Sequence, residues 1–190
     1  MKFNLTPSIS KLTRCLLSTG LITSALTATS VNAEMLPSET AHLNPSFKIA
    51  IVGGAAGSHD INKGNYKVGI DKISAKAKLN DDDSFLETTF ATSMGLCVAN
   101  MKLERFNDAK SACSKAIKAI EGISGQTSHS RYLTSIAYSN RAIVNHYLGD
   151  KVSAYKDISR AMKVDSNYIV KANAEALNKA IIKKELLAKL

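Results

Sequence analysis

The sequence predicts an all-α fold: a short stack of antiparallel helix hairpins that ends in a C-terminal capping helix. The first observation is a hairpin pattern over residues 137–167, where small and apolar side chains recur three or four positions apart on both sides of a Leu148-Gly149-Asp150 corner. Side chains at that spacing share one face of an α-helix. The second observation is the composition, 45% hydrophobic with 6% aromatic residues and no Trp, which suits helices that pack through alanine and small aliphatic side chains. A length of 190 residues corresponds to about one domain.

The corner of this hairpin has the residues that end one helix and begin the next. Gly149 can adopt the left-handed conformation at a helix C-terminus, and Asp150 follows as an N-cap. The whole pattern resembles a tetratricopeptide repeat. The family's aromatic, small, corner and second-helix positions are held by Tyr138, Ala142, Gly149, Ala154, Ile158 and Ala161, and the departures are Asn145 for Tyr, Lys151 for the corner aromatic and Ser166 for the closing Pro. The resemblance implies a scaffold that holds another molecule, and it does not identify that molecule.

We expect residues 1–33 to be a cleaved secretory signal. Lys2, Lys11 and Arg14 precede a moderately apolar stretch, and Val31-Asn32-Ala33 offers small residues at the cleavage-defining positions. The stretch is too short and too rich in hydroxyl groups for a membrane anchor, and the arginine directly before Cys15 argues against a lipoprotein signal. The sequence therefore predicts an exported protein, either periplasmic or secreted.

Removing the signal changes the net charge of the chain. Residues 1–33 carry three of the 25 basic residues and no acid, so 22 basic residues remain against 16 acidic ones, a net charge of +6. We interpret this excess as a solvated basic face. Nucleic acid is not an expected partner of an exported chain with so few aromatic side chains to stack on bases.

Residues 34–57 are predicted to form an extended N-terminal segment. Its first part carries Pro37 and Pro45 among short polar residues. From residue 47 onward we expect a short extended stretch or irregular helix that lies on the helical stack. The glycines at 53, 54 and 57 do not fit the G-x-G-x-x-G motif of dinucleotide-binding folds.

Residues 58–167 are predicted to form about two and a half repeat units. Gly64-Asn65-Tyr66 resembles the corner of the repeat, so residues 65–78 are expected to be the second half of a degenerate first unit. The second unit has a predicted helix over 85–103 and a partner helix over 106–120. Acidic residues at 81–83, together with Ser84 and Glu87, predict the start of the first of these helices.

A linker and a capping helix complete the prediction. Residues 122–130, rich in Gly and Ser, are expected to be a flexible linker before the third unit. Residues 168–190 are predicted to form the capping helix that a repeat array needs over its last apolar face. The apolar stripe of this helix is predicted at Ile169, Ala172, Ala176, Ala180, Ile181 and Leu187.

Two cysteines, Cys97 and Cys113, lie beyond the signal, at equal distances from Arg105 in a predicted helix–helix turn. Residues equidistant from such a turn face each other when both are on inner faces, and the repeat resemblance implies inner faces for both. Since an oxidising compartment favours pairing, we predict a Cys97–Cys113 disulfide, worth roughly 3 kcal/mol on the loop-entropy estimate. Two buried free thiols are the alternative.

The repeat resemblance also implies where a ligand binds. Family members bind ligands in the groove lined by the first helix of each unit, which here presents Met94, Val98, Met101, Asn140, Ile143 and Tyr147. Asn140 matches the asparagine that chaperone-binding members use against a peptide backbone, but Met94 and Val98 replace the Lys and Asn of their carboxylate clamp. We therefore predict an apolar groove for an extended peptide or a partner helix. Coverage of the groove by the chain's own N-terminal segment is the alternative.

The sequence predicts no catalytic residue, metal ligand or cofactor. The four histidines are scattered, none within helical reach of a second His or Cys, and no serine-centred nucleophile motif is present. The leading hypothesis is an exported module, not an enzyme, that binds a protein or peptide in the cell envelope. The alternatives are a structural protein that touches the membrane surface weakly through its C-terminal helix and, less favoured, an enzyme with an unrecognised site. The oligomeric state has no signal in the sequence.

Overall fold

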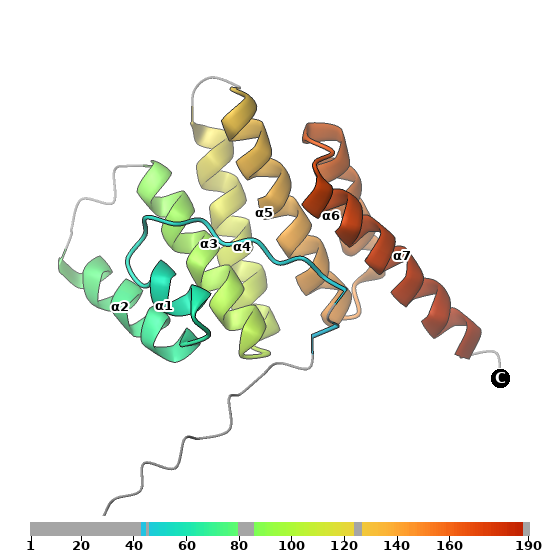
Figure 1. Ribbon diagram of the computed structural model, residues 1–190, viewed down its shortest axis with the longest axis horizontal. Helices are drawn as coiled ribbons and strands as arrows, with labels where there is room; N and C mark the ends of the chain where they lie inside the picture. The colour runs from blue at the N-terminus through green and yellow to red at the C-terminus, as the bar shows by residue number, and fades with distance from the viewer. Residues whose placement is uncertain (1–42, 45, 80–85, 124–126, 188–190) are drawn as a thin grey trace, which may run out of the picture. The chain divides into compact units, whose positions relative to one another are not determined.

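The described part of the chain is all-helical. The computed structural model describes residues 43–44, 46–79, 86–123 and 127–187, except for the side chains of 78, 79 and 182–187. These residues belong to one compact unit, Leu36–Leu190, and contain no strand (Figure 1). The seven helices are α1 (Ser58–Asn62), α2 (Tyr66–Leu79), α3 (Leu86–Lys102), α4 (Phe106–Gly122), α5 (Ser128–Tyr147), α6 (Lys151–Val164) and α7 (Tyr168–Leu187).

Helices that follow each other in the sequence pack against each other. The most extensive contacts join α3 to α4 and α5 to α6, and α4 packs against α5 between these two pairs. Helices α1 and α2 lie against α3, whereas α7 lies against α5 and α6 (Figure 1). The prediction of an all-helical fold with packed neighbouring helices is therefore confirmed.

Three corners between helices use the same hydrogen bond. Gly64, Glu104 and Gly149 each have a positive φ, of 86°, 58° and 79°. The next residue in each case donates its backbone N–H to the carbonyl oxygen five positions back, with an N–O distance of 2.9 Å at all three corners. This is the six-to-one bond of the Schellman motif, which ends a helix and turns the chain. Glu104 is the one non-glycine residue with positive φ in the described ranges.

Small residues lie where the helices approach each other. Ala109 and Ala116 of α4 and Ala154 and Ala161 of α6 are buried, as are the longer side chains between them. A disulfide joins Cys97 of α3 to Cys113 of α4, whose Cα atoms are 4.9 Å apart. The predicted bond is thus present in the structure and crosslinks the two helices of one hairpin.

The predicted linker over 122–130 is wrong in extent. Helix α4 continues through Gly122 and α5 begins at Ser128. The reason is Thr127, whose side-chain oxygen accepts the backbone N–H of Ser130 at 3.0 Å and so caps α5. The predicted capping residues at 81–84 before α3 lie outside the described residues.

The predicted apolar face of the capping helix also needs correction. Among the described side chains of α7, the buried ones are Ile169, Val170, Asn173, Ala176 and Leu177, whereas Ala172, Ala180 and Ile181 are only half-buried. The side chain of Leu187 lies outside the described residues. Asn173, which the predicted stripe did not include, is buried and forms hydrogen bonds with Lys48 and Ser139. Over the described ranges, no helix combines the length and apolarity needed to cross a bilayer.

Candidate functional site

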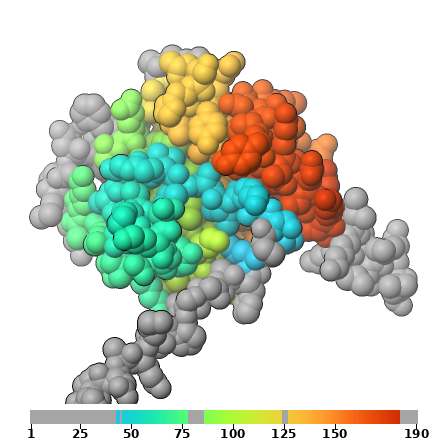
Figure 2. Space-filling view, viewed as in Figure 1, coloured from blue at the N-terminus to red at the C-terminus, as the bar shows by residue number. Residues whose placement is uncertain are grey.

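One face of the molecule is built by α3, α5 and α7, and an extended stretch of the chain lies across it. This stretch, residues 47–52, is named here the groove segment. It passes over the three helices before the chain turns towards α1 (Figure 1). The space-filling view shows it between the surface of α1–α2 and that of α7 (Figure 2). The groove predicted from the sequence is therefore occupied by the chain itself.

Asn173 of α7 holds the backbone of Lys48 at two points. The N–H of Lys48 donates to Asn173 Oδ1 at 2.7 Å, and Asn173 Nδ2 donates to the carbonyl oxygen of Lys48 at 2.8 Å. The same Nδ2 also donates to Ser139 Oγ of α5 at 2.8 Å. Asn173 is buried, so its amide uses its polar atoms within the protein and is fixed in orientation.

Asn140 of α5 repeats this arrangement two residues further along the groove segment. Its Nδ2 donates to the carbonyl oxygen of Ala50 at 2.8 Å, and the N–H of Ala50 donates to its Oδ1 at 3.3 Å. Alternate residues of an extended chain present their backbone groups on the same edge. The two asparagines therefore recognise one edge of an extended backbone, independently of side chains.

An aromatic cluster anchors the beginning of the groove segment. Phe47 is 7% exposed, and its ring lies edge-on to those of His146 and Tyr147, with centroids 5.7 and 6.0 Å away. The Tyr147 ring stacks on that of Phe106, 5.0 Å away. The Tyr147 hydroxyl accepts the backbone N–H of Asn44 at 2.6 Å, and burial raises the pKa of this phenol above its usual value of 10.0, opposed by that hydrogen bond.

The other side chains of the groove segment alternate between two apolar clusters. Ile49 and Ile51 pack against a cluster that contains Ile61, Ile73 and Val98. Ala50 and Val52 pack against a different one, made by residues of α3, α4 and α5 with Ile169 of α7. This alternation matches the two-residue period of an extended chain.

The residues predicted to line the groove lie beneath the groove segment. Met94, Val98, Met101, Asn140 and Ile143 are buried, and Tyr147 is half-buried. Met101 and Ile143 share a cluster with Phe47, Val98 shares one with Ile49, and Met94 shares one with Ala50. The alternative weighed from the sequence, coverage by the chain's own N-terminal segment, is thus the arrangement in the structure.

Sequence reasoning missed Asn173 and Phe47 as parts of this site. A signal for Asn173 was present: it follows Asn140 by 33 positions, close to one repeat length of 34 residues. No comparable signal marks Phe47, because a lone aromatic residue after a proline-containing stretch has no characteristic spacing.

Hollows flank the groove segment on two sides. One, of about 470 Å³, lies beyond Val52 and is mostly apolar; it is named here the Val52 hollow. Its apolar walls are Phe90 and Ala91 of α3, Leu133 of α5, and Ile120 and Ile123 at the end of α4, and its polar residues are Glu87, Thr127, His129 and Ser130. The other, of about 440 Å³, lies beside Phe47 and Ile49 and extends to Tyr66 and Tyr168. The groove therefore has more room than its resident segment uses.

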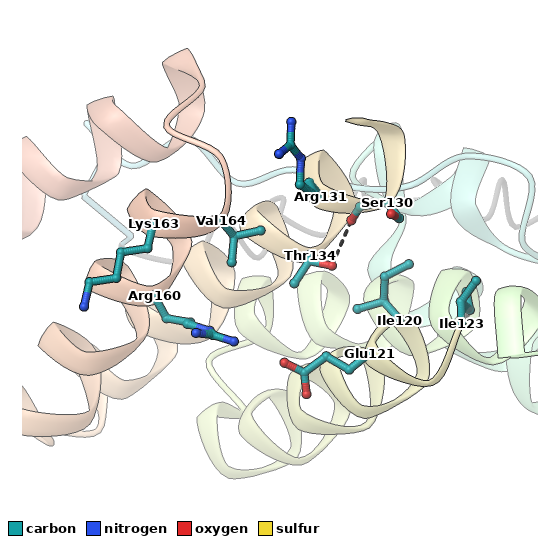
Figure 3. Close-up of a pocket in the computed structure, with 9 residues that line it drawn as sticks. All are labelled: Ile120, Glu121, Ile123, Ser130, Arg131, Thr134, Arg160, Lys163 and Val164. Atoms are coloured by element: carbon teal, nitrogen blue, oxygen red, sulfur yellow. Dashed lines mark hydrogen bonds between the residues drawn. The ribbon is translucent and has the colours of Figure 1, made fainter. Parts of the chain in front are cut away.

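A third pocket, of about 460 Å³, lies between the ends of α4 and α6 and the beginning of α5. Basic residues Arg131, Arg160 and Lys163 line it together with Glu121. In Figure 3 the Arg160 and Glu121 side chains point towards each other, whereas Arg131 and Lys163 extend away from the pocket. Because the cations do not converge, this pocket lacks the geometry of an anion site.

A partly buried ionic network joins helices α4, α5 and α6. Arg141 of α5 donates two hydrogen bonds of 2.7 Å to the carboxylate of Asp157 of α6 and one of 3.1 Å to Ser114 of α4. The hydrogen bond to Asp157 raises the pKa of the Arg141 guanidinium above its usual value. Asn145 also donates to Asp157, at 2.9 Å. The network thus holds three helices together through side-chain hydrogen bonds.

Comparison with known proteins gives no relative: no family model, curated protein or solved structure matches the chain. The resemblance to tetratricopeptide repeats therefore rests on the residues themselves. Within the described ranges, no three His, Cys, Asp or Glu side chains gather as they would around a metal ion.

Proposed function

We propose that the chain is an exported interaction module, a short stack of tetratricopeptide-like repeats whose groove binds an extended segment of a protein partner in the cell envelope. The observation that supports this proposal is the paired grip of Asn140 and Asn173 on the backbone of residues 50 and 48. Backbone recognition of an extended chain, combined with pockets for alternate side chains, is a recurring mode of peptide binding.

The groove segment is a resident ligand in this proposal. It is joined to α1 through Gly53 and Gly54, around which a Cβ atom would meet nothing within 4 Å. The short tether gives the groove segment a high effective concentration at the groove, and a partner segment must compete against it. The apparent affinity of a partner is then reduced by the fraction of molecules in which the groove is closed.

Export is supported by the disulfide as well as by the signal-like N-terminus. Disulfides persist in oxidising compartments, and Cys97–Cys113 lies in the helical core. The alternative is contact with a membrane surface through the C-terminal helix. Lys171 and Lys179 are exposed on α7, but two exposed lysines do not favour a membrane surface over the groove as the binding site.

Binding in trans tests the proposal. The open-groove variant carries Phe47→Ser and Ile49→Ser in the full chain, which weakens the resident segment and leaves the groove residues unchanged. A labelled peptide of residues 44–52 should bind it in a fluorescence anisotropy titration. Adding Asn140→Ala and Asn173→Ala should weaken binding at least tenfold. An open-groove variant that is folded, by circular dichroism and an intact disulfide, yet binds no peptide contradicts the proposal.

A further inference from the structure

The Val52 hollow continues the groove beyond the point where the resident segment stops filling it. The groove segment runs antiparallel to α5: Asn44 contacts Tyr147 near the end of that helix, and Ala50 contacts Asn140 near its middle. Val52 reaches the hollow that Leu133 lines nearer the beginning of α5. Residues 53–55 form a bend, and the chain then turns towards α1 (Figure 1).

The residue that would enter the hollow follows from the alternation of side chains. Ala50 and Val52 both face the cluster that contains Phe90 and Ile120, and these two residues also line the hollow. With a two-residue period, the next side chain on that face belongs to position 54. In this chain position 54 is a glycine with a φ of 90°, so the resident segment sends no side chain there.

We infer that the partner's segment is longer than the resident one and places an apolar side chain, at the position of Gly54, in the Val52 hollow. This inference rests on the proposed function. The partner segment thus has an aromatic residue at the position of Phe47, any residue at that of Lys48, and aliphatic residues at those of Ile49 and Ile51. Beyond the position of Val52 the partner segment remains extended and reaches the apolar residue at the position of Gly54.

This pattern explains how a partner competes with a tethered segment. Both ligands use the same asparagine grip and the same aromatic anchor, so those contacts give neither an advantage. The additional apolar side chain covers the apolar walls of the Val52 hollow, which the resident segment leaves exposed to water. Full burial of a leucine-sized side chain contributes enough to change an affinity by about tenfold or more.

The experiment compares three labelled peptides of residues 44–54 on the open-groove variant: the native sequence, Gly54→Leu and Gly53→Leu. We expect Gly54→Leu to bind about tenfold more tightly than the native peptide. Gly53→Leu is the matched control, because its side chain lies on the opposite face and should give no gain. Equal affinity of the Gly54→Leu and native peptides would overturn the inference while leaving the proposed function intact. Absence of binding by all three would instead contradict the proposed function.

A second substitution checks that the gain comes from the hollow. Ala91→Phe in the open-groove variant places a ring where the new leucine should lie. It should abolish the advantage of the Gly54→Leu peptide and leave the affinity of the native peptide unchanged. If the advantage persists, the added side chain binds elsewhere and the inference is wrong.

The wild-type chain provides a test that does not depend on the open-groove variant. Addition of excess Gly54→Leu peptide should accelerate hydrogen exchange at the amides of Lys48 and Ala50 in the isotope-labelled chain, because the resident segment is displaced. The native peptide should do so less. Concentration-dependent dimers of the wild-type chain that Phe47→Ser abolishes would identify a second copy as the occupant and overturn the assignment to a distinct partner.

Discussion

The side-chain amide of Asn173 and the backbone of Lys48 form a two-way hydrogen-bonded pair, although 125 residues separate them in the sequence. Asn140 forms the same pair with Ala50 across 90 residues. These contacts connect the beginning of the described chain to its third hairpin and to its last helix. Both asparagines therefore have a structural role and, under the proposed function, a recognition role as well.

Substitution of Asn173 should release the groove segment. Asn173→Ala removes both partners of the Lys48 backbone, and leaving buried polar groups unpaired costs about 1–3 kcal/mol. We expect faster hydrogen exchange at Lys48 and a lower free energy of unfolding by urea. Asn178→Ala, an exposed change on the same helix, is the control and should alter neither quantity. Unchanged exchange at Lys48 in Asn173→Ala would show that the amide does not hold the segment.

The disulfide should contribute measurably to stability. A thiol assay on a chain that starts at residue 34, denatured without reductant, should find no free sulfhydryl. Cys97→Ala with Cys113→Ala should lower the free energy of unfolding by about 3 kcal/mol, the loop-entropy value for a loop of this size. The reductant-treated wild type should match the double variant. Two free thiols in the unreduced protein would be the contrary result.

Removing only one partner of the partly buried pair of Arg141 and Asp157 should destabilise the fold. Asp157→Leu leaves the guanidinium and the Asn145 amide without their partner, and leaving polar groups unpaired in this way costs about 1–3 kcal/mol. The double variant Arg141→Leu with Asp157→Leu should be more stable than the single variant, because no buried charge remains. A double-mutant cycle in urea measures this coupling. A double variant less stable than Asp157→Leu would disprove this account.

Acid should weaken the cap of α6. Hydrogen bonds from Ser153, with a smaller contribution from Lys110, lower the pKa of Asp150 below its usual 3.8. A lowered folded-state pKa means that the carboxylate stabilises the fold above about pH 3.8 and that this contribution is lost as the pH falls through the lower folded value.

Asp150→Asn separates the charge from the cap, because asparagine is also a good N-cap residue. We expect a urea midpoint close to that of the wild type at pH 7 and a smaller decrease than the wild type between pH 5 and pH 3. The pKa of Asp60 is also lowered, chiefly by its hydrogen bond from Lys72. Asp60 is present in both proteins, so it contributes equally to the acid-induced decrease in both urea midpoints. Identical pH profiles for the two proteins would show that Asp150 does not contribute to acid sensitivity.

Local signals in the sequence were sufficient for the hairpins. Gly149 and Asp150 marked a corner because helix termini have strong residue preferences, and Ala154 with Ala161 marked a packed face because helical spacing is regular. The Cys97–Cys113 bond could be predicted because a short turn relates residues on either side of it by near symmetry. Thr127 was missed as a cap because it lies in a run of small polar residues that resembles a linker.

The occupant of the groove could not be predicted in the same way. Whether a polar residue such as Asn173 faces solvent or a backbone depends on a segment 125 residues away, and no local pattern contains that information. Asn140 was identified as a groove residue through its resemblance to a known repeat position. The segment that it holds was one of two alternatives, and only the three-dimensional arrangement distinguishes them.

An array of helix hairpins ordinarily behaves as a one-dimensional system, in which each unit is stabilised by its immediate neighbours and the ends can unfold separately. The groove segment changes this, because it contacts α3, α5 and α7 together. Loss of the last helix therefore also exposes the first described residues, so the two ends share one cooperative transition. The same long-range contacts raise the contact order of the chain, and folding is correspondingly slower than in an array with only local contacts.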